Sequence, residues 1–121
     1  MPTFVVLLRH DPSRYAGFSA DQFAALIKKY RDWSAPLIAS GTIEFGRKLV
    51  DDRGKSVRKD GDQLVVKDGP FNETKEFVGG VYVMKADGYA RVIELLRDHP
   101  HYSIGGTIEV RQIDFGGGPE D

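Results

Sequence analysis

The sequence lacks cysteine altogether, and it also lacks an excess of charge of either sign. The absence of cysteine excludes disulfides and thiolate zinc sites, and it suits a reducing compartment. With 17 basic and 18 acidic residues the formal net charge is −1, whereas a nucleic-acid-binding surface requires a clustered basic excess. No segment approaches the ~20 apolar residues of a membrane-spanning helix. The apolar run at residues 4–8 is too short for a signal peptide and follows no basic residue. We therefore expect a cytoplasmic protein that binds neither nucleic acid nor membrane.

What the sequence does contain is enough apolar and aromatic material for the core of one domain. The 121 residues are 40% hydrophobic and include seven Phe, five Tyr and one Trp. We predict a single domain over residues 3–115 and a flexible C-terminal tail over residues 116–121. Periodicity and turn residues predict strands at 3–9, 42–50, 56–58, 63–67, 80–85 and 107–114, and helices at 19–40 and 87–98.

The two predicted helices carry end signals that physical chemistry explains. Ser19 and Gln22 have the spacing of a capping box at the start of the first helix. Pro36 lies inside the same apolar pattern, so we expect it to kink this helix or to restart it with Ser34 as a new N-cap. Asp87 is expected to cap the second helix.

The order of the predicted elements indicates a fold class. The chain reads β-α-β, a β-hairpin signalled by Asp60-Gly61, and then a second β-α-β. Two right-handed β-α-β units give a ferredoxin-like α+β sheet with both helices on one face. The strands at 3–9, 63–67 and 80–85 nevertheless look apolar on both faces. Because an exposed apolar sheet face is a liability, we expect a homodimer in which the two sheets stack face to face.

One stretch does not look like core: DGPFNETKE at residues 68–76, followed by Gly79-Gly80. Gly69 and Pro70 favour a turn, Gly69 in a backbone conformation costly for alanine, and charged residues follow at once. We interpret the stretch as a loop of the kind that carries sites. It resembles the signature of the DGPF group within the YCII-related family, and residues 105–111 are similar to that family's closing strand. The resemblance covers residues 3 to about 113 and implies a ferredoxin-like fold in a dimeric α/β-barrel-like assembly.

Two residues are candidates for acid–base chemistry. Asp68 could act as a general acid or base in a cleft, or it could be a turn residue that accepts backbone N–H bonds. His10 follows the first strand at a sheet rim, where it could pair with a carboxylate and titrate near neutrality, or it could be a solvent-exposed strand end. The family resemblance implies a His–Asp pair whose histidine lies on the first helix. This chain has no histidine between Ser19 and Gly41, so only Asp68 matches that pattern.

The candidate substrate-binding cations lie on the loop and on two strands. Lys75 could anchor a substrate carboxylate, or it could belong to a solvated loop or an inter-subunit charge network. Arg9 and Arg111 would form a carboxylate-binding pair if they were adjacent. Alternatively, Glu109 and Arg111 could take part in a cross-strand ion-pair ladder.

The aromatic and histidine residues allow a pocket but not a metal site. Tyr82, with Trp33 and Phe71, could line an apolar pocket, and ordinary core packing is the alternative. His99 and His101 flank a proline at a helix end. Catalytic zinc needs a third protein ligand, which nothing in the sequence specifies, so we expect no metal and no other cofactor.

Two functions remain open from the sequence. The first is a small dimeric enzyme or small-molecule binder without a cofactor. Asp68 would be the acid or base at the dimer cleft, His10 would lie nearby, and Lys75 or Arg111 would hold a small organic acid. Fold analogy suggests proton transfer or elimination as the reaction class. The alternative is a non-catalytic interaction or regulatory module. Because members of the DGPF group resemble partners or neighbours of extracytoplasmic-function sigma factors, the resemblance makes a sigma factor conceivable as a partner.

Overall fold

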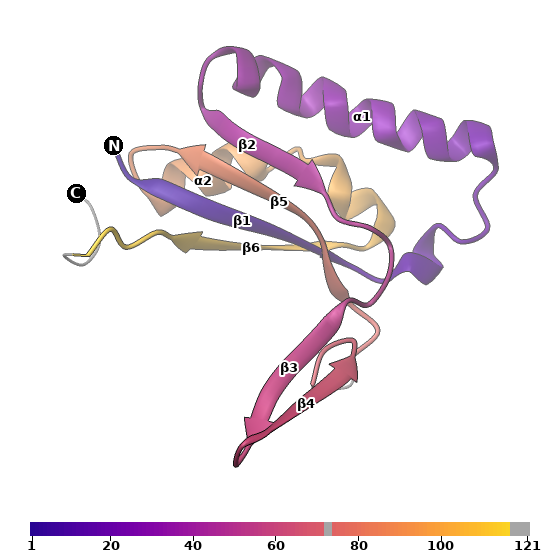
Figure 1. Cartoon of the computed structure of the whole chain (residues 1–121). Helices are drawn as coiled ribbons and strands as arrows, with labels where there is room; N and C mark the ends of the chain where they lie inside the picture. Colours follow the sequence, from indigo (N-terminus) through magenta and orange to yellow (C-terminus); the bar gives the residue numbers. More distant parts are fainter. Residues whose placement is uncertain (72–73, 117–121) are drawn as a thin grey trace.

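The computed structural model describes residues 1–71 and 74–116 (Figure 1). Each strand and helix expected from the sequence is present, with its ends shifted by a few residues. In chain order the elements are β1 (Thr3–His10), η1 (Pro12–Arg14), α1 (Ala20–Ala39), β2 (Ile43–Lys48), β3 (Lys55–Asp60), β4 (Gln63–Asp68), β5 (Phe77–Lys85), α2 (Tyr89–Leu96), η2 (Pro100–Ile104) and β6 (Thr107–Gln112), where η1 and η2 are short 3₁₀ helices.

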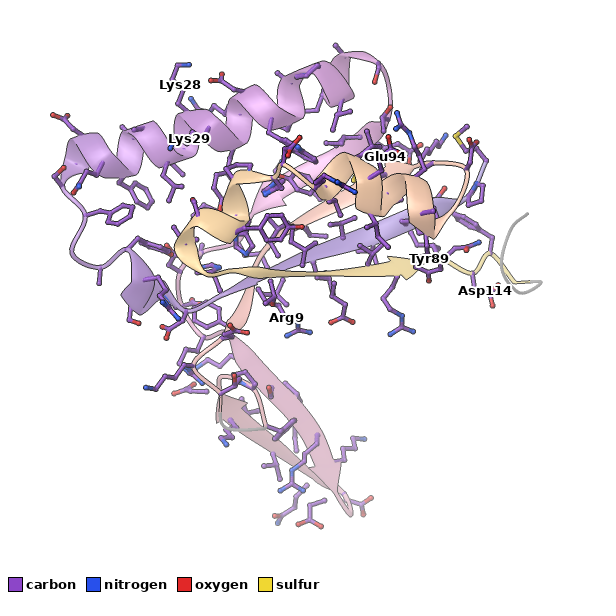
Figure 2. The ribbon with its side chains drawn as sticks, turned by 180° about the vertical axis from the view of Figure 1, so that it is seen from behind. Arg9, Lys28, Lys29, Tyr89, Glu94 and Asp114 are labelled. Atoms are coloured by element: carbon purple, nitrogen blue, oxygen red, sulfur yellow. The ribbon has the colours of Figure 1, made fainter. Side chains whose placement is uncertain are left out.

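Four strands form one antiparallel sheet in the order β2-β5-β1-β6. α1 connects β1 to β2, and α2 connects β5 to β6, so each helix joins two parallel strands with a third strand between them. Both helices lie on the same face of this sheet (Figure 1, Figure 2). The fold is therefore α+β and ferredoxin-like, as the order of elements predicts.

The helix-facing side of β1 is the centre of the core. Phe4, Val6 and Leu8 are at most 4% exposed, and they pack with buried side chains of the neighbouring strands and with Val92 and Leu96 of α2. Burial of each such side chain contributes about 1.5–3 kcal/mol of transfer free energy. The alternation along β1 follows from the pleat of a strand, which sends successive side chains to opposite faces.

In the part of the chain that the structure describes, the other face of the sheet carries no helix. Val5 and Leu7 of β1 lie there, and the strand register puts Val81 and Val83 of β5 beside them. These side chains are only half-buried, and Phe45 of β2 on the same face is 45% exposed. The expectation that β1 is buried on both faces is therefore not met within one chain. The sheet therefore leaves these apolar side chains on the face away from both helices.

The β3–β4 hairpin forms a separate two-stranded sheet that projects from the body (Figure 1). Its turn contains Gly61 at φ 61°, in agreement with the predicted hairpin signal. Val57, Leu64 and Val66 of the hairpin are 55–63% exposed. Residues 63–67 form the second strand of this hairpin, as the predicted order of elements has it, and are not part of the four-stranded sheet. Within the described residues β4 pairs with β3 alone, while β5, the next strand in the chain, lies between β1 and β2.

α1 begins as the sequence predicts. Ser19 Oγ accepts from the backbone N–H of Gln22 at 3.1 Å, and the Gln22 side chain accepts from the N–H of Ser19 at 2.8 Å. The helix continues through Pro36 without a restart at Ser34, whose hydroxyl instead donates to the carbonyl of Arg31. Pro36 stands in the last turn, so it removes a single backbone hydrogen bond before the helix ends.

α2 begins one residue later than expected, and Asp87 does not cap it. Gly88 occupies the N-cap position and provides no side-chain acceptor. The helix is held instead by tertiary packing of its buried residues Val92 and Leu96. Within the described part of the chain, neither this helix nor α1 is long and apolar enough to cross a membrane.

Candidate functional site

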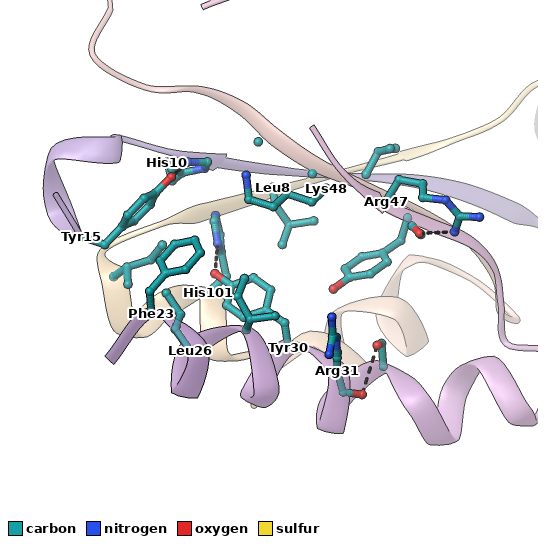
Figure 3. A pocket seen from close by; sticks show the side chains of 18 residues that line it. Leu8, His10, Tyr15, Phe23, Leu26, Tyr30, Arg31, Arg47, Lys48 and His101 are labelled. Carbon is teal, nitrogen blue, oxygen red and sulfur yellow. Dashed lines mark hydrogen bonds between the residues drawn. The ribbon is translucent and has the colours of Figure 1, made fainter. Parts of the chain in front are cut away.

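A cavity of about 570 Å³ lies between the helix-facing side of the sheet and α1 (Figure 3). Its walls come from β1, β2, β5, α1, η2 and the segment after η1, and much of the lining is apolar, as at Leu8, Phe23 and Leu26. A volume of this size is typical of small-molecule sites. The cavity therefore has the dimensions and the apolar character of a binding site for a small organic molecule.

His10, the last residue of β1, forms part of the cavity wall and is only 5% exposed. Its Nε2 lies 3.0 Å from the Tyr15 hydroxyl and 3.6 Å from Oδ1 of Asp51, which also forms a 3.0 Å ion pair with Lys48. Partial burial alone would raise the pKa of Asp51. Hydrogen bonds from Tyr15 and Lys48, together with nearby positive charge, outweigh that effect and hold the pKa below its ordinary value. Asp51 is thus a carboxylate at neutral pH, placed to stabilise a protonated His10.

Glycines make room for the rings that line this region. A Cβ on Gly79 would overlap the imidazole of His10, and a Cβ on Gly106 would overlap the imidazole of His101. At Gly46 a Cβ would lie 2.8 Å from Cδ1 of Tyr82. These glycines are needed because a ring lies flat against the backbone at each of them.

Tyr30 of α1 and His101 of η2 meet in the cavity wall (Figure 3). The Tyr30 hydroxyl oxygen is 2.7 Å from Nδ1 of His101, and Nε2 of His101 is 2.7 Å from the carbonyl oxygen of Arg9. A carbonyl can only accept, so His101 donates from Nε2 and its Nδ1 must accept the Tyr30 proton. Burial lowers the pKa of His101, although the bond to the Arg9 carbonyl opposes this, so the ring is neutral.

His99 lies behind Tyr82 and is 2% exposed. Its Nδ1 accepts the backbone N–H of His101 at 3.0 Å, and its Nε2 is 3.0 Å from the Tyr82 hydroxyl. Burial, helped by the neighbouring His101, lowers the pKa of His99 to about 3. The indole of Trp33 packs against His99, with ring centroids 4.4 Å apart, and against Tyr82 at 5.5 Å. Trp33 is therefore part of the packing behind the cavity.

The three tyrosines of the wall keep their protons at all physiological pH values. Burial raises the pKa of Tyr82 to about 12. It also raises the pKa of Tyr30 and of Tyr15, where the neighbouring Asp51 carboxylate adds to the effect. Each of these phenols is therefore a neutral hydroxyl that can donate or accept a hydrogen bond.

The charged side chains in the cavity lining, among the described residues, are all cationic: Arg31, Arg47 and Lys48. Lys48 pairs with Asp51. Arg47 donates to the carbonyl of Gly46 at 2.7 Å, and its guanidinium lies over the ring of Phe45 on the opposite face of the sheet, 5.0 Å from the centroid. The Arg31 side chain points from α1 toward the cavity (Figure 3). Within residues 1–71 and 74–116 it has no carboxylate partner. Among the described residues, the positive charge that the lining offers to a ligand is therefore that of Arg31.

Of the residues predicted from the sequence, His10 and Tyr82 come together in the cavity wall. Arg9 and Arg111 are on the opposite face of the sheet. Arg9 pairs with Glu109 at 3.1 Å, and Arg111 lies opposite Val5 rather than beside Arg9. The arginine pair that depended on adjacency is therefore not formed within the chain. The cross-strand ion pair runs between Arg9 and Glu109.

Asp68 ends β4 on the projecting hairpin and lies outside the cavity, with its side chain 81% exposed. It is ion-paired with Lys55, whose hydrogen bond and charge lower the pKa of Asp68. The chain thus does not bring Asp68 to His10, and an acid or base role for Asp68 stays a prediction that requires an assembly to enclose it. Lys75 is exposed and Phe71 is 41% exposed, both away from the cavity. The loop residues Asn72 and Glu73, and the tail beyond Gly116, lie outside the described residues.

A second cavity, of about 480 Å³, lies at the base of the hairpin and is lined by Arg9, Arg53 and Pro70. Both arginines are already engaged: Arg9 with Glu109, and Arg53 with the carbonyl of Thr74 at 2.7 Å. This cavity therefore lies where the loop at residues 68–76 meets the body of the protein. Its two arginines are less available to a ligand than the polar groups of the cavity at His10.

Sequence reasoning missed Tyr15, Tyr30 and Asp51, and it considered His101 only as a metal ligand. Within the described residues no group of three or more potential ligands is placed to hold a metal ion. The sequence feature that could have pointed to His10 and His101 is the pair of adjacent glycines at residues 79–80 and again at residues 105–106. Each pair contains a glycine under a histidine ring.

Comparison with known proteins gives a match to a family and a likeness to solved structures. The YCII-related domain matches residues 3–115. Among solved structures the chain is similar to 5-chloro-2-hydroxyhydroquinone dehydrochlorinase from Burkholderia phenoliruptrix AC1100, in complex with 2,5-dihydroxybenzoquinone. That likeness has 18% identity, covers 96% of each chain and has a TM-score of 0.49. A search of curated proteins finds no match. Because the domain match spans nearly the whole chain, this protein belongs to the YCII-related family.

Proposed function

We propose that the protein is a small enzyme that takes a small organic anion into the cavity between α1 and the sheet and transfers a proton with His10. The observation that carries this proposal is the position of His10. It is buried in the wall of a cavity of about 570 Å³, beside the hydroxyl of Tyr15 and the carboxylate of Asp51. A buried imidazole with an orienting carboxylate is the arrangement used for general acid–base catalysis.

Each neighbour of His10 has a separate part in this reaction. As His10 takes a proton from the substrate, Asp51 at 3.6 Å stabilises the positive charge that forms on the ring. Tyr15, at 3.0 Å from Nε2, keeps its proton and restrains the orientation of the imidazole. Lys48 holds Asp51 by an ion pair, so the carboxylate keeps its place and its charge. Return of the proton to another atom of the substrate, or loss of a leaving group, completes an isomerisation or an elimination.

Charge selects the substrate class. Among the charged residues of the described lining, Lys48 is paired with Asp51 and the Arg47 guanidinium lies over Phe45 on the opposite face of the sheet, which leaves the positive charge of Arg31 for a ligand. A cavity of one sign with apolar walls concentrates ligands of the opposite sign. Arg31, which has no ion-pair partner among the described residues, is the side chain placed to hold the substrate's carboxylate or other anionic oxygen.

The substitution His10→Gln tests this assignment. Glutamine can place an N–H near the position of Nε2 but cannot accept a proton. A screen of small carboxylic acids and phenols by ligand-observed NMR would first identify compounds that bind the wild type. We expect His10→Gln to keep their binding and to lower turnover by about 10²–10⁴-fold. Lys29→Gln, at an exposed position of α1 outside the cavity lining, is the matched control and should keep both binding and turnover. Unchanged turnover in His10→Gln, or a library in which nothing binds, would overturn the proposal.

We also propose that the protein acts as a homodimer through the uncovered face of the sheet. Val5, Leu7, Val81, Val83 and Phe45 form an apolar patch there that a single chain leaves partly in water. Stacking against the same face of a second copy would bury the patch and enclose the Arg9–Glu109 pair. Leu7→Lys should convert the dimer into a monomer, while Arg97→Gln, on an exposed position after α2, should not. A wild type that sediments as a compact monomer at micromolar concentration would contradict this assembly.

A further inference from the structure

We infer that His99 is a positioning residue that fixes the Tyr82 hydroxyl as a hydrogen-bond donor into the cavity, while His101 fixes the Tyr30 hydroxyl as an acceptor. The cavity would then select an organic anion that also carries a hydroxyl group. This inference rests on the proposed function, because it concerns the ligand of the same cavity.

The direction of the hydrogen bond between His99 and Tyr82 is set by a backbone amide. The N–H of His101 can only donate, and it lies 3.0 Å from Nδ1 of His99. Nδ1 therefore carries no proton, and the proton of the neutral ring is on Nε2. At 3.0 Å from the Tyr82 oxygen, Nε2–H donates and the phenol accepts. This bond leaves the Tyr82 proton for a group inside the cavity, which Tyr82 lines.

At Tyr30 the direction is reversed, so that the phenol donates to the histidine, and it is set by a backbone carbonyl. Nε2 of His101 donates to the carbonyl of Arg9 at 2.7 Å, so Nδ1 accepts and the Tyr30 hydroxyl donates to it. The Tyr30 oxygen keeps its lone pairs, which can accept a hydrogen bond from a ligand. Both phenols lie against His99, whose ring centroid is 5.2 Å from that of Tyr30 and 5.7 Å from that of Tyr82.

Burial prevents the network from reversing. His99 and His101 are each 2% exposed, and both rings are uncharged at neutral pH. A proton on Nδ1 of His99 would set two donors against each other at the His101 N–H. In a buried site such a conflict costs more than a hydrogen bond contributes. The cavity therefore presents one fixed donor and one fixed acceptor, together with the cationic side chain of Arg31.

A ligand that satisfies these groups needs an acceptor oxygen for Tyr82 and a hydroxyl for Tyr30. The three isomers of hydroxybenzoate meet this description, and the matching methoxybenzoates keep the anion and the ring but cannot donate. We expect the best hydroxybenzoate to bind about two- to tenfold more tightly than its methoxy counterpart, the worth of one hydrogen bond. Tyr30→Phe should abolish that preference, because it removes the acceptor.

Two substitutions at His99 distinguish a role in positioning Tyr82 from a purely structural role. In His99→Gln the side-chain N–H can reach the position of Nε2, but the acceptor for the His101 N–H is lost. In His99→Asn the acceptor at the position of Nδ1 is kept, but the donor to Tyr82 is lost. We expect His99→Asn to weaken binding of the best hydroxybenzoate about as much as Tyr82→Phe does, and His99→Gln to keep it within twofold. The order of stability should be the opposite: His99→Gln should unfold at a lower urea concentration than His99→Asn.

Loss of binding in parallel with loss of stability would show a merely structural His99 and overturn the inference. Nitrogen-15 NMR of the histidine rings in the unliganded protein at pH 7 tests the polarity independently. We expect the proton of both His99 and His101 on Nε2, and a proton on Nδ1 of either ring would refute the network. Failure of every hydroxybenzoate to bind the wild type would refute the ligand class. An unchanged turnover in His10→Gln, in contrast, would overturn the proposed function and leave these results standing.

Discussion

Replacement of Gly79 by alanine should destabilise the protein through a single steric conflict. A Cβ added at Gly79 would overlap the His10 imidazole, whose nearest atom there is Cε1. The backbone at Gly79 is not in the left-handed region, so alanine meets no conformational strain in addition. The imidazole cannot simply turn away, because Tyr15 and Phe77 each lie 5.6 Å from it and His101 lies 5.8 Å from it, centroid to centroid. The conflict must therefore be relieved by distortion of a packed region.

Overpacking of this kind costs about 1–3 kcal/mol in the free energy of unfolding. For a domain of this size that corresponds to a fall in melting temperature of about 4 °C per kcal/mol. With a urea m-value of about 2 kcal/mol/M, the midpoint should fall by about 0.5–1.5 M. Urea and thermal denaturation followed by circular dichroism measure both quantities. Gly17→Ala is the matched control, because a Cβ at Gly17 has no heavy atom within 4 Å.

A double-mutant cycle identifies the cause. In a His10→Ala background the imidazole is absent, so Gly79→Ala should cost at least about 1 kcal/mol less than in the wild type. Equal costs in the two backgrounds, or a Gly79→Ala variant as stable as Gly17→Ala, would refute the argument that the glycine exists to accommodate the ring.

Two further predictions concern the loop and the response to acid. Gly69 has φ +82°, and its Cβ would lie 3.0 Å from Nε of Arg53. Gly69→Ala should therefore lower stability by about 1–3 kcal/mol, whereas Lys75→Ala on the exposed loop should change it by no more than about 0.5 kcal/mol; the reverse order in urea denaturation would contradict this. Burial lowers the pKa of His99 from 6.5 to about 3, so between these values the unfolded chain binds a proton that the native state does not. Stability should thus decrease as the pH is lowered from 6.5 toward 3, and less steeply in His99→Gln. Identical slopes in urea denaturation from about pH 4 to pH 7 would rule out this role of His99.

Local features of the protein could be read from the sequence alone. The capping box of Ser19 and Gln22, the hairpin turn at Gly61 and the left-handed backbone at Gly69 depend on neighbours within a few residues. The order of the strands and helices then restricts the fold to the ferredoxin-like arrangement that is observed. His10 and Tyr82, both candidates from the sequence, line the same cavity.

The composition of the cavity, in contrast, depended on contacts between residues far apart in the chain. Tyr30 meets His101 across 71 residues, and the ring of His10 lies against Gly79 because β1 pairs with β5. Sequence periodicity shows which face of a strand is apolar but not which strand becomes its neighbour. The separation of Asp68 from His10 has the same origin. In the described structure β3 and β4 pair with each other in a separate sheet and carry Asp68 away from the cavity.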